Sequence, residues 1–87
     1  ADLPVVLAVV SSYRDAVIPD DLVAIGEVGL TGEIRSVSHT NQRLGEVARL
    51  GFKKVIIPRG GAEKLEIPEG LTVYRVRNIR EAIEVAM

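Results

Sequence analysis

The stretch LVAIGEVGLTGEIRSV, residues 22–37, decides the fold because it contains a strand, a turn and a second strand in succession. Residues 22–28 are mostly apolar and rich in β-branched side chains, and residues 33–37 add an Ile and a Val, which favours strands on both sides. Residues 29–32 read GLTG and have glycine at both ends, as a tight turn requires. The stretch therefore predicts an antiparallel hairpin.

A helix is predicted before the hairpin, over residues 3–14. The Val-rich composition of this segment also fits a strand, but the run is long for one. Asp2 suits an N-cap and Pro4 fits a first helical turn. The segment is so apolar that we expect the helix to be buried on most sides. Pro19 and two aspartates then mark a loop.

A second helix is predicted after the hairpin. Leu44, Val47 and Ala48 follow the i, i+3, i+4 spacing of one helical face. We expect Thr40 to cap its start and Gly51 to end it in the left-handed conformation.

The last third of the chain predicts two strands and a terminal helix. The strands cover residues 53–58 and 71–76, with a short helical turn over residues 60–65 between them. Asn78 followed three residues later by Glu81 resembles a capping box. The face of the helix that follows is apolar: Ile79, Ala82, Ile83 and Ala86. This order of elements predicts one α/β domain, a two-layer sandwich with a mixed sheet.

Composition limits the kinds of site that the chain can build. It has 87 residues, of which 47% are hydrophobic, so it can bury only a modest core. It has no cysteine, which excludes disulfides, thiol catalysis and thiolate metal sites. Its single histidine cannot build a metal centre without carboxylate ligands, and nothing in the sequence suggests zinc. The longest apolar run, residues 3–10, is too short to span a membrane. We expect a cytoplasmic protein, and the absence of an initial Met suggests a fragment of a longer chain.

Charge is unevenly divided along the chain. Residues 1–33 hold one basic and six acidic side chains, a balance of −5, and residues 34–87 hold ten basic and six acidic ones, a balance of +4. Either the two halves neutralise each other within the fold, or a basic face meets nucleic acid or an acidic neighbour.

Two glycine-rich segments are candidate phosphate sites. Gly26, Gly29 and Gly32 flank the hairpin turn rather than a strand-to-helix junction. The segment PRGGAEK, residues 58–64, does follow a strand and places Arg59 where it can contact a phosphate. Neither spacing fits a nucleotide-binding fingerprint, so both segments are interpreted as turns and loops.

Three segments in one order carry a resemblance to a known family. They are GEVGLTGEIRSV at residues 26–37, QRL near the start of the second helix, and LGFKKVIIP at residues 50–58. Together they resemble the proteolytic domain of the Lon family, without a gap from Gly26 to Pro58 and more loosely through residues 66–87. Lon chemistry uses a serine nucleophile and a lysine that accepts its proton.

The resemblance implies that this chain lacks the Lon catalytic pair. The lysine position falls on Asn41, whose amide cannot accept a proton from a hydroxyl. The neighbouring lysine falls on Arg43, whose pKa is too high for a base. The serine position falls immediately before Ala1. We therefore expect no catalytic residue and no enzyme activity in this domain.

Two families share the Lon-like fold without the catalytic pair. The chain is similar to the C-terminal Lon-like domain of the RadA (Sms) family of bacterial DNA repair and recombination proteins, and less so to the magnesium-chelatase-like ComM group. LGFKKVIIP favours RadA. This resemblance implies that residues 1–87 form a partial Lon-like domain that is truncated at its N-terminus. It also implies that the parent protein forms a hexameric ring and binds DNA and recombination proteins such as RecA. ATP, Mg and Zn are implied only for the parent protein, and no cofactor is expected in this segment.

The residues expected to contact DNA flank one helix end and the strand after it: Arg43, Arg49, Lys53 and Lys54. The alternative to this nucleic-acid-binding face is a solvated surface. The alternative to the whole reading is an active Ser-Lys peptidase, in which Ser11 or Ser12 pairs with one of the lysines Lys53, Lys54 and Lys64.

Overall fold

The computed structural model describes residues 1–61 and 64–87. Its elements, in chain order, are α1 (Leu3–Arg14), β1 (Leu22–Ala24), β2 (Glu27–Val28), β3 (Ile34–Arg35), α2 (Thr40–Arg49), β4 (Lys54–Pro58), β5 (Thr72–Val76) and α3 (Ile79–Ala86). The helical turn predicted for residues 60–65 includes residues 62–63, which lie outside the described residues.

Parallel and antiparallel pairs occur in two separate sheets. The main sheet has the order β1-β4-β5, and both of its pairs are parallel, with Val23 opposite Val55 and Val55 opposite Val73. Strands β2 and β3 form the predicted antiparallel hairpin, with Val28 opposite Ile34. The α/β class with parallel and antiparallel pairing is confirmed, although the two kinds of pair do not share one mixed sheet.

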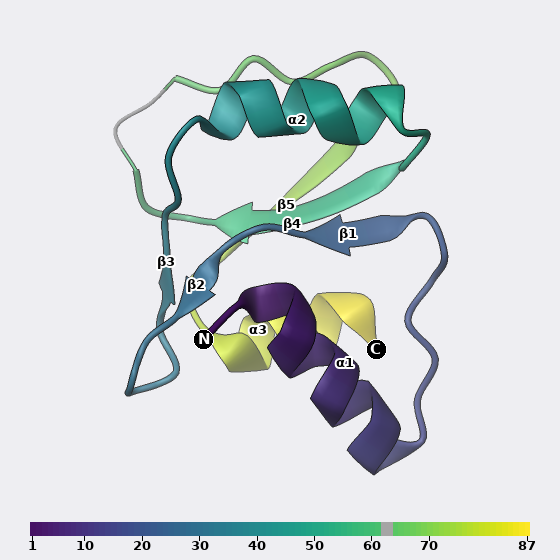
Figure 1. Ribbon diagram of the computed structural model, residues 1–87, viewed down its shortest axis with the longest axis vertical. Coiled ribbons are helices and arrows are strands. Elements are labelled where there is room, and N and C mark those ends of the chain that lie inside the picture. Colours follow the sequence, from purple (N-terminus) through teal and green to yellow (C-terminus); the bar gives the residue numbers. More distant parts are fainter. Residues whose placement is uncertain (62–63) are drawn as a thin grey trace.

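Helices cover both faces of the main sheet (Figure 1), so the layers number three rather than the predicted two. Side chains on strand β4 alternate between the two faces. Val55 and Ile57 pack in the cluster under α2, whereas Ile56 packs in the cluster that contains residues of α1 and α3. All three are at most 2% exposed. A strand covered on both faces reads as a continuous apolar run, which is what residues 55–57 show.

The prediction of one strand over residues 22–28 is wrong, because the chain leaves the main sheet at Gly26. Gly26 has a φ of 152°, a conformation that favours glycine. A Cβ at this position would approach Ile34 Cγ2 at 3.0 Å and Pro58 Cγ at 3.3 Å. The close approach lets β1 pair with β4 while β2 turns into the hairpin.

Helix ends follow the local signals in three of four cases. Asp2 accepts from the Val5 N–H at 3.2 Å, Asn78 accepts from the Glu81 N–H at 2.9 Å, and Gly51 has a φ of 97° beyond the end of α2. The expected Thr40 cap is wrong. His39 holds the cap position with a φ of 61° and no side-chain bond to the helix, and Thr40 is already helical.

Helix α1 is less buried than its composition predicts. Only Leu3 and Leu7 are buried along it, whereas Val5, Val9 and Tyr13 are 61%, 63% and 91% exposed. The helix packs on the sheet and α3 through one face only, so the expectation of burial on most sides is wrong. Within residues 1–61 and 64–87, no helix combines the length and the apolar character that crossing a membrane requires.

Candidate nucleic-acid interface

Asn41, which the Lon resemblance places at the lysine position, binds the backbone of a distant segment. Its Nδ2 donates to the Lys64 carbonyl at 2.7 Å, and its Oδ1 accepts from the Glu66 N–H at 2.7 Å. An amide supplies a donor and an acceptor on two separate atoms, whereas a lysine ammonium only donates. The side chain thereby links the start of α2 to residues 64–66.

The two predicted arginines lie on α2 and have local partners. Arg43 Nε donates to the Ser38 carbonyl at 2.8 Å, near the start of the helix. Arg49 pairs with Glu46 at 2.5 Å in the last turn. They are separated by six residues, or about 9 Å along a helix axis. Both side chains are exposed.

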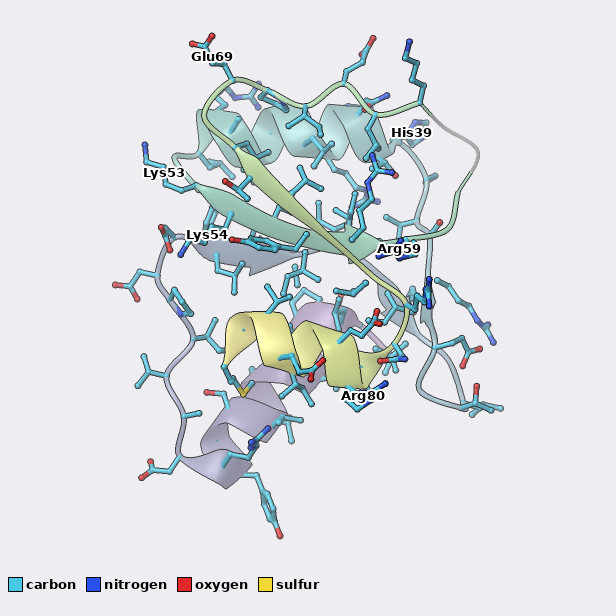
Figure 2. The ribbon with its side chains drawn as sticks, turned by 180° about the vertical axis from the view of Figure 1, so that it is seen from behind. His39, Lys53, Lys54, Arg59, Glu69 and Arg80 are labelled. Atoms are coloured by element: carbon cyan, nitrogen blue, oxygen red, sulfur yellow. The ribbon has the colours of Figure 1, made fainter. Side chains whose placement is uncertain are left out.

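The two predicted lysines lie at the amino end of β4. Figure 2 shows Lys53 and Lys54 at the end of the sheet opposite Arg59. Lys54 has the same parity along β4 as Ile56, so it belongs to the face that α1 and α3 cover. Arg49, Lys53 and Lys54 thus share one end of the domain, but Arg43 does not join them.

A different pair of arginines meets at the carboxyl end of the sheet. Arg59 follows β4 directly, and Arg75 lies opposite Ile57 on β5. Both line a cleft of about 110 Å³ beside the start of α2. Among the described residues, neither guanidinium forms an ion pair with a carboxylate. The other described residues that line the cleft are neutral: Ser36, Val37, Thr40, Ile57, Pro58, Gly60, Gly61 and Leu65.

The loop that carries Arg59 is held on two sides. The Arg59 N–H donates to the Val76 carbonyl at 2.7 Å, which continues the pairing of β4 with β5. Ser36 Oγ donates to the Gly60 carbonyl at 2.8 Å. Gly61 has a φ of 132°, and a Cβ there would lie 3.1 Å from Ser36 Oγ. Interpreting residues 58–64 as a plain loop did not predict these bonds around Arg59, and Arg75 was not predicted from the sequence as a site residue. The signal for both was the position of arginines at neighbouring carboxyl ends of parallel strands.

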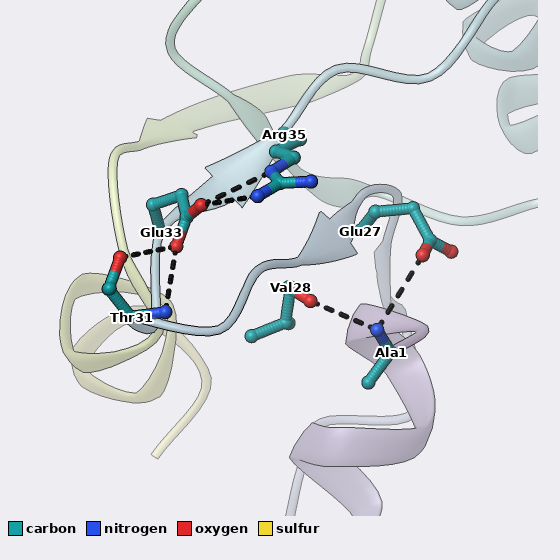
Figure 3. A network of polar contacts seen from close by, with 6 residues as sticks. All are labelled: Ala1, Glu27, Val28, Thr31, Glu33 and Arg35. Atoms are coloured by element: carbon teal, nitrogen blue, oxygen red, sulfur yellow. Dashed lines mark hydrogen bonds and ion pairs between the residues drawn. The ribbon is translucent and has the colours of Figure 1, made fainter.

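The hairpin carries a separate polar network (Figure 3). The Glu33 carboxylate accepts from the Thr31 hydroxyl at 2.6 Å and from Arg35 Nη2 at 2.8 Å. These bonds favour the charged form, and they lower the pKa of Glu33 to about 2, with Thr31 as the largest cause and Arg35 the next. At the other end of the hairpin, Glu27 lies 3.6 Å from the Ala1 amino group.

Of the two serines in the peptidase alternative, Ser11 bonds to a nearby backbone carbonyl. Ser11 Oγ donates to the Ala16 carbonyl at 2.5 Å, where α1 ends. Within the described part of the chain, no group of three or more His, Asp and Glu side chains is arranged to hold a metal ion.

Comparisons with known proteins gave one matching family model and a set of similar relatives. A family model described as subunit ChlI of Mg-chelatase matches residues 1–61. The chain is 45% identical over 85 residues to the DNA repair protein RadA of Escherichia coli K12 and 51% identical over 85 residues to that of Aquifex aeolicus, covering 98% of this chain in both cases. It is 43% identical over 86 residues to RadA of Bacillus subtilis.

The chain belongs to the family of that model, described as subunit ChlI of Mg-chelatase, and it is a homologue of the C-terminal region of RadA. It spans only 18% to 19% of the length of these RadA relatives. The resemblance to RadA deduced from LGFKKVIIP is therefore confirmed, and the match to the Mg-chelatase model is consistent with it.

Proposed function

We propose that this chain is a non-catalytic Lon-like assembly and DNA-binding module of a RadA-type DNA repair ATPase. The observation that carries the proposal is the identity with proteins named DNA repair protein RadA across 98% of the chain. A ComM-type parent is the nearest alternative, and the match to the Mg-chelatase model supports it less because that match ends at residue 61.

Asn41 supports the non-catalytic part of the proposal. Both polar atoms of its amide bind backbone groups of Lys64 and Glu66, which gives the position a structural use that a lysine cannot fulfil. Incubation of the chain with unfolded casein is expected to release no peptides above the buffer background. Turnover that Ser11→Ala or Ser12→Ala abolishes would establish the Ser-Lys peptidase instead.

The distribution of basic residues supports DNA binding. Ten of the eleven basic side chains lie in residues 34–87, but the chain as a whole has a net charge of −1. A few phosphate contacts release few counterions, so binding should be weak and steeply dependent on salt. Fluorescence anisotropy with a labelled DNA strand, repeated over a salt series, tests this. Affinity that stays unchanged at high salt would contradict a phosphate-based mechanism.

Exposed apolar surface supports assembly. Strand β1 is an edge of the main sheet, and Val5, Val9 and Tyr13 form an exposed stripe at i, i+4, i+8 on α1 beside it. Edges and apolar patches of this kind recruit partners. We expect self-association that depends on concentration in light scattering, and that Val5→Glu with Val9→Glu abolishes. A strict monomer at high concentration would contradict the assembly role.

A further inference from the structure

We propose that the cleft at the carboxyl ends of β4 and β5 binds one phosphate group, held by Arg59 and Arg75. Nothing in the family comparison assigns a ligand to this cleft. The inference rests on the proposed DNA-binding function and deepens it, because it names the place where a phosphate of the nucleic acid is held. It also differs from the face predicted from sequence, which lies partly at the opposite end of the sheet.

Charge is the first argument for an anion in this cleft. Two guanidinium groups line it, and none of its described lining residues is acidic. Arg35 and Arg49, by contrast, have carboxylate partners at 2.8 Å and 2.5 Å. The planar donor fork of arginine matches two oxygens of a phosphate at once, which favours phosphate over a simple halide.

The shape of the cleft limits what it holds. Its volume is about 110 Å³, well below the roughly 300 Å³ at which pockets for drug-sized ligands begin. One phosphate group fits this size better than a base or a whole nucleotide. Ile57 and Leu65 contribute apolar lining, and attraction between charges is stronger beside such groups than in open water.

The backbone leaves room for the anion beside Arg59. A Cβ added at Gly60 would meet no atom within 4 Å, so this part of the loop faces open space. Gly60 also has no positive φ, so an alanine there is not strained. The cleft lies at the carboxyl end of a parallel sheet, which is where open α/β sheets bind their ligands.

The source of the phosphate is either the backbone of a DNA strand or a free phosphate group. Titration of the chain with inorganic phosphate, followed by 15N NMR, is expected to shift the backbone signals of Gly60 and Gly61 and the side-chain signals of Arg59 and Arg75. An oligothymidylate without a terminal phosphate is expected to shift the same signals if the internal phosphates of a strand are the source. Shifts with inorganic phosphate but none with this oligonucleotide would identify a free or terminal phosphate as the ligand, so the site would stand and its role in DNA binding would fall.

Charge-matched variants complete the test. Arg59→Gln and Arg75→Gln are each expected to weaken DNA binding about tenfold and to reduce its salt slope by about one. Lys53→Gln removes the same charge at the opposite end of the sheet, and we expect its affinity to stay within about twofold of the parent. Gly60→Ala adds a methyl group to the open part of the loop, and it is expected to weaken binding of inorganic phosphate while preserving the NMR spectrum of the fold.

Two results would overturn the inference. One is that inorganic phosphate shifts no signal in the cleft. The other is that the double variant Arg59→Gln, Arg75→Gln binds DNA with the affinity of the parent while Lys53→Gln binds it more weakly. That result would keep the proposed DNA binding but place it at the amino end of the sheet. If the parent chain binds inorganic phosphate in the cleft but binds no DNA, the result would contradict the proposed function and leave the phosphate site standing.

Discussion

The two ends of the parallel sheet are built differently. At the amino end, backbone groups bond to one another: the Lys53 and Lys54 N–H groups both donate to the Asp21 carbonyl at 3.0 Å, and the Thr72 N–H donates to the Lys53 carbonyl at 2.9 Å. At the carboxyl end, side chains hold the backbone. Asn41 binds residues 64 and 66, and Ser36 binds Gly60.

This difference decides how well each end positions charge. Polar side chains at the carboxyl end bond to the backbone of Gly60, Lys64 and Glu66, and the Arg59 N–H bonds to the Val76 carbonyl, so Arg59 projects from a bonded backbone. The lysines at the amino end also project from a paired backbone, and among the described residues neither these lysines nor the two arginines form an ion pair. The ends therefore differ in what holds the backbone beneath each charge, and a backbone held in one shape loses less freedom on binding.

The largest change in stability that we expect from this comparison comes from a substitution of Asn41. Asn41→Ala leaves the Lys64 carbonyl and the Glu66 N–H without their side-chain partner, and it should lower the free energy of unfolding by about 1–3 kcal/mol. Urea denaturation measures this. Lys53→Ala, at the other end, should change stability by less than about 0.5 kcal/mol. Equal effects of the two substitutions would show that the ends do not differ in this way.

A smaller effect is expected at the start of α3, which also lies at the carboxyl end. Asn78 accepts from the Glu81 N–H, and Glu81 Oε1 accepts in return from the Arg77 N–H at 2.7 Å. Asn78→Ala should cost about 1 kcal/mol in thermal or urea unfolding. Asp2→Ala is the matched control, because Asp2 caps α1 through a longer bond of 3.2 Å with no reciprocal partner. A greater loss for Asp2→Ala would contradict the ranking.

The smallest effect concerns Glu33 and pH. Its pKa is lowered to about 2 from 4.5, so its contribution to stability is fully present above pH 4.5 and is lost as the pH falls through about 2. The group is exposed, so the contribution is small. NMR titration of the Glu33 carboxyl carbon should place its midpoint near 2. Thr31→Val should raise that midpoint more than Arg35→Gln does, because the Thr31 hydroxyl is the larger cause. A parent midpoint near 4.5 would show that the hairpin network does not form.

Local signals in the sequence predicted most of the elements. Asp2 and Pro4 identified α1 over residues 3–14, which are its observed bounds. The cap at Asn78, the left-handed Gly51 and the apolar run of β4 were also predicted, because each depends on interactions between residues close in the chain. The RadA resemblance followed from ordered motifs, which linear sequence preserves.

Tertiary structure alone decided where those elements meet. The break at Gly26 lies where an added Cβ would crowd Ile34 and Pro58, which come from two other strands. The exposed face of α1 depends on which neighbours cover it, and an apolar composition does not state that.

The candidate site shows the same division. The arginines and the glycine loop are visible in the sequence. Arg59 and Arg75, however, are far apart along the chain, because the whole loop between β4 and β5 lies between them. They meet because the two strands are parallel neighbours in register, with Ile57 opposite Arg75, so their carboxyl ends reach the same edge. Their places beside one helix end and the next strand predicted Arg43, Arg49, Lys53 and Lys54 as one face, yet the fold separates Arg43 from the others. Which charges share a surface is set by strand order and helix direction, because these bring residues together regardless of their distance in sequence.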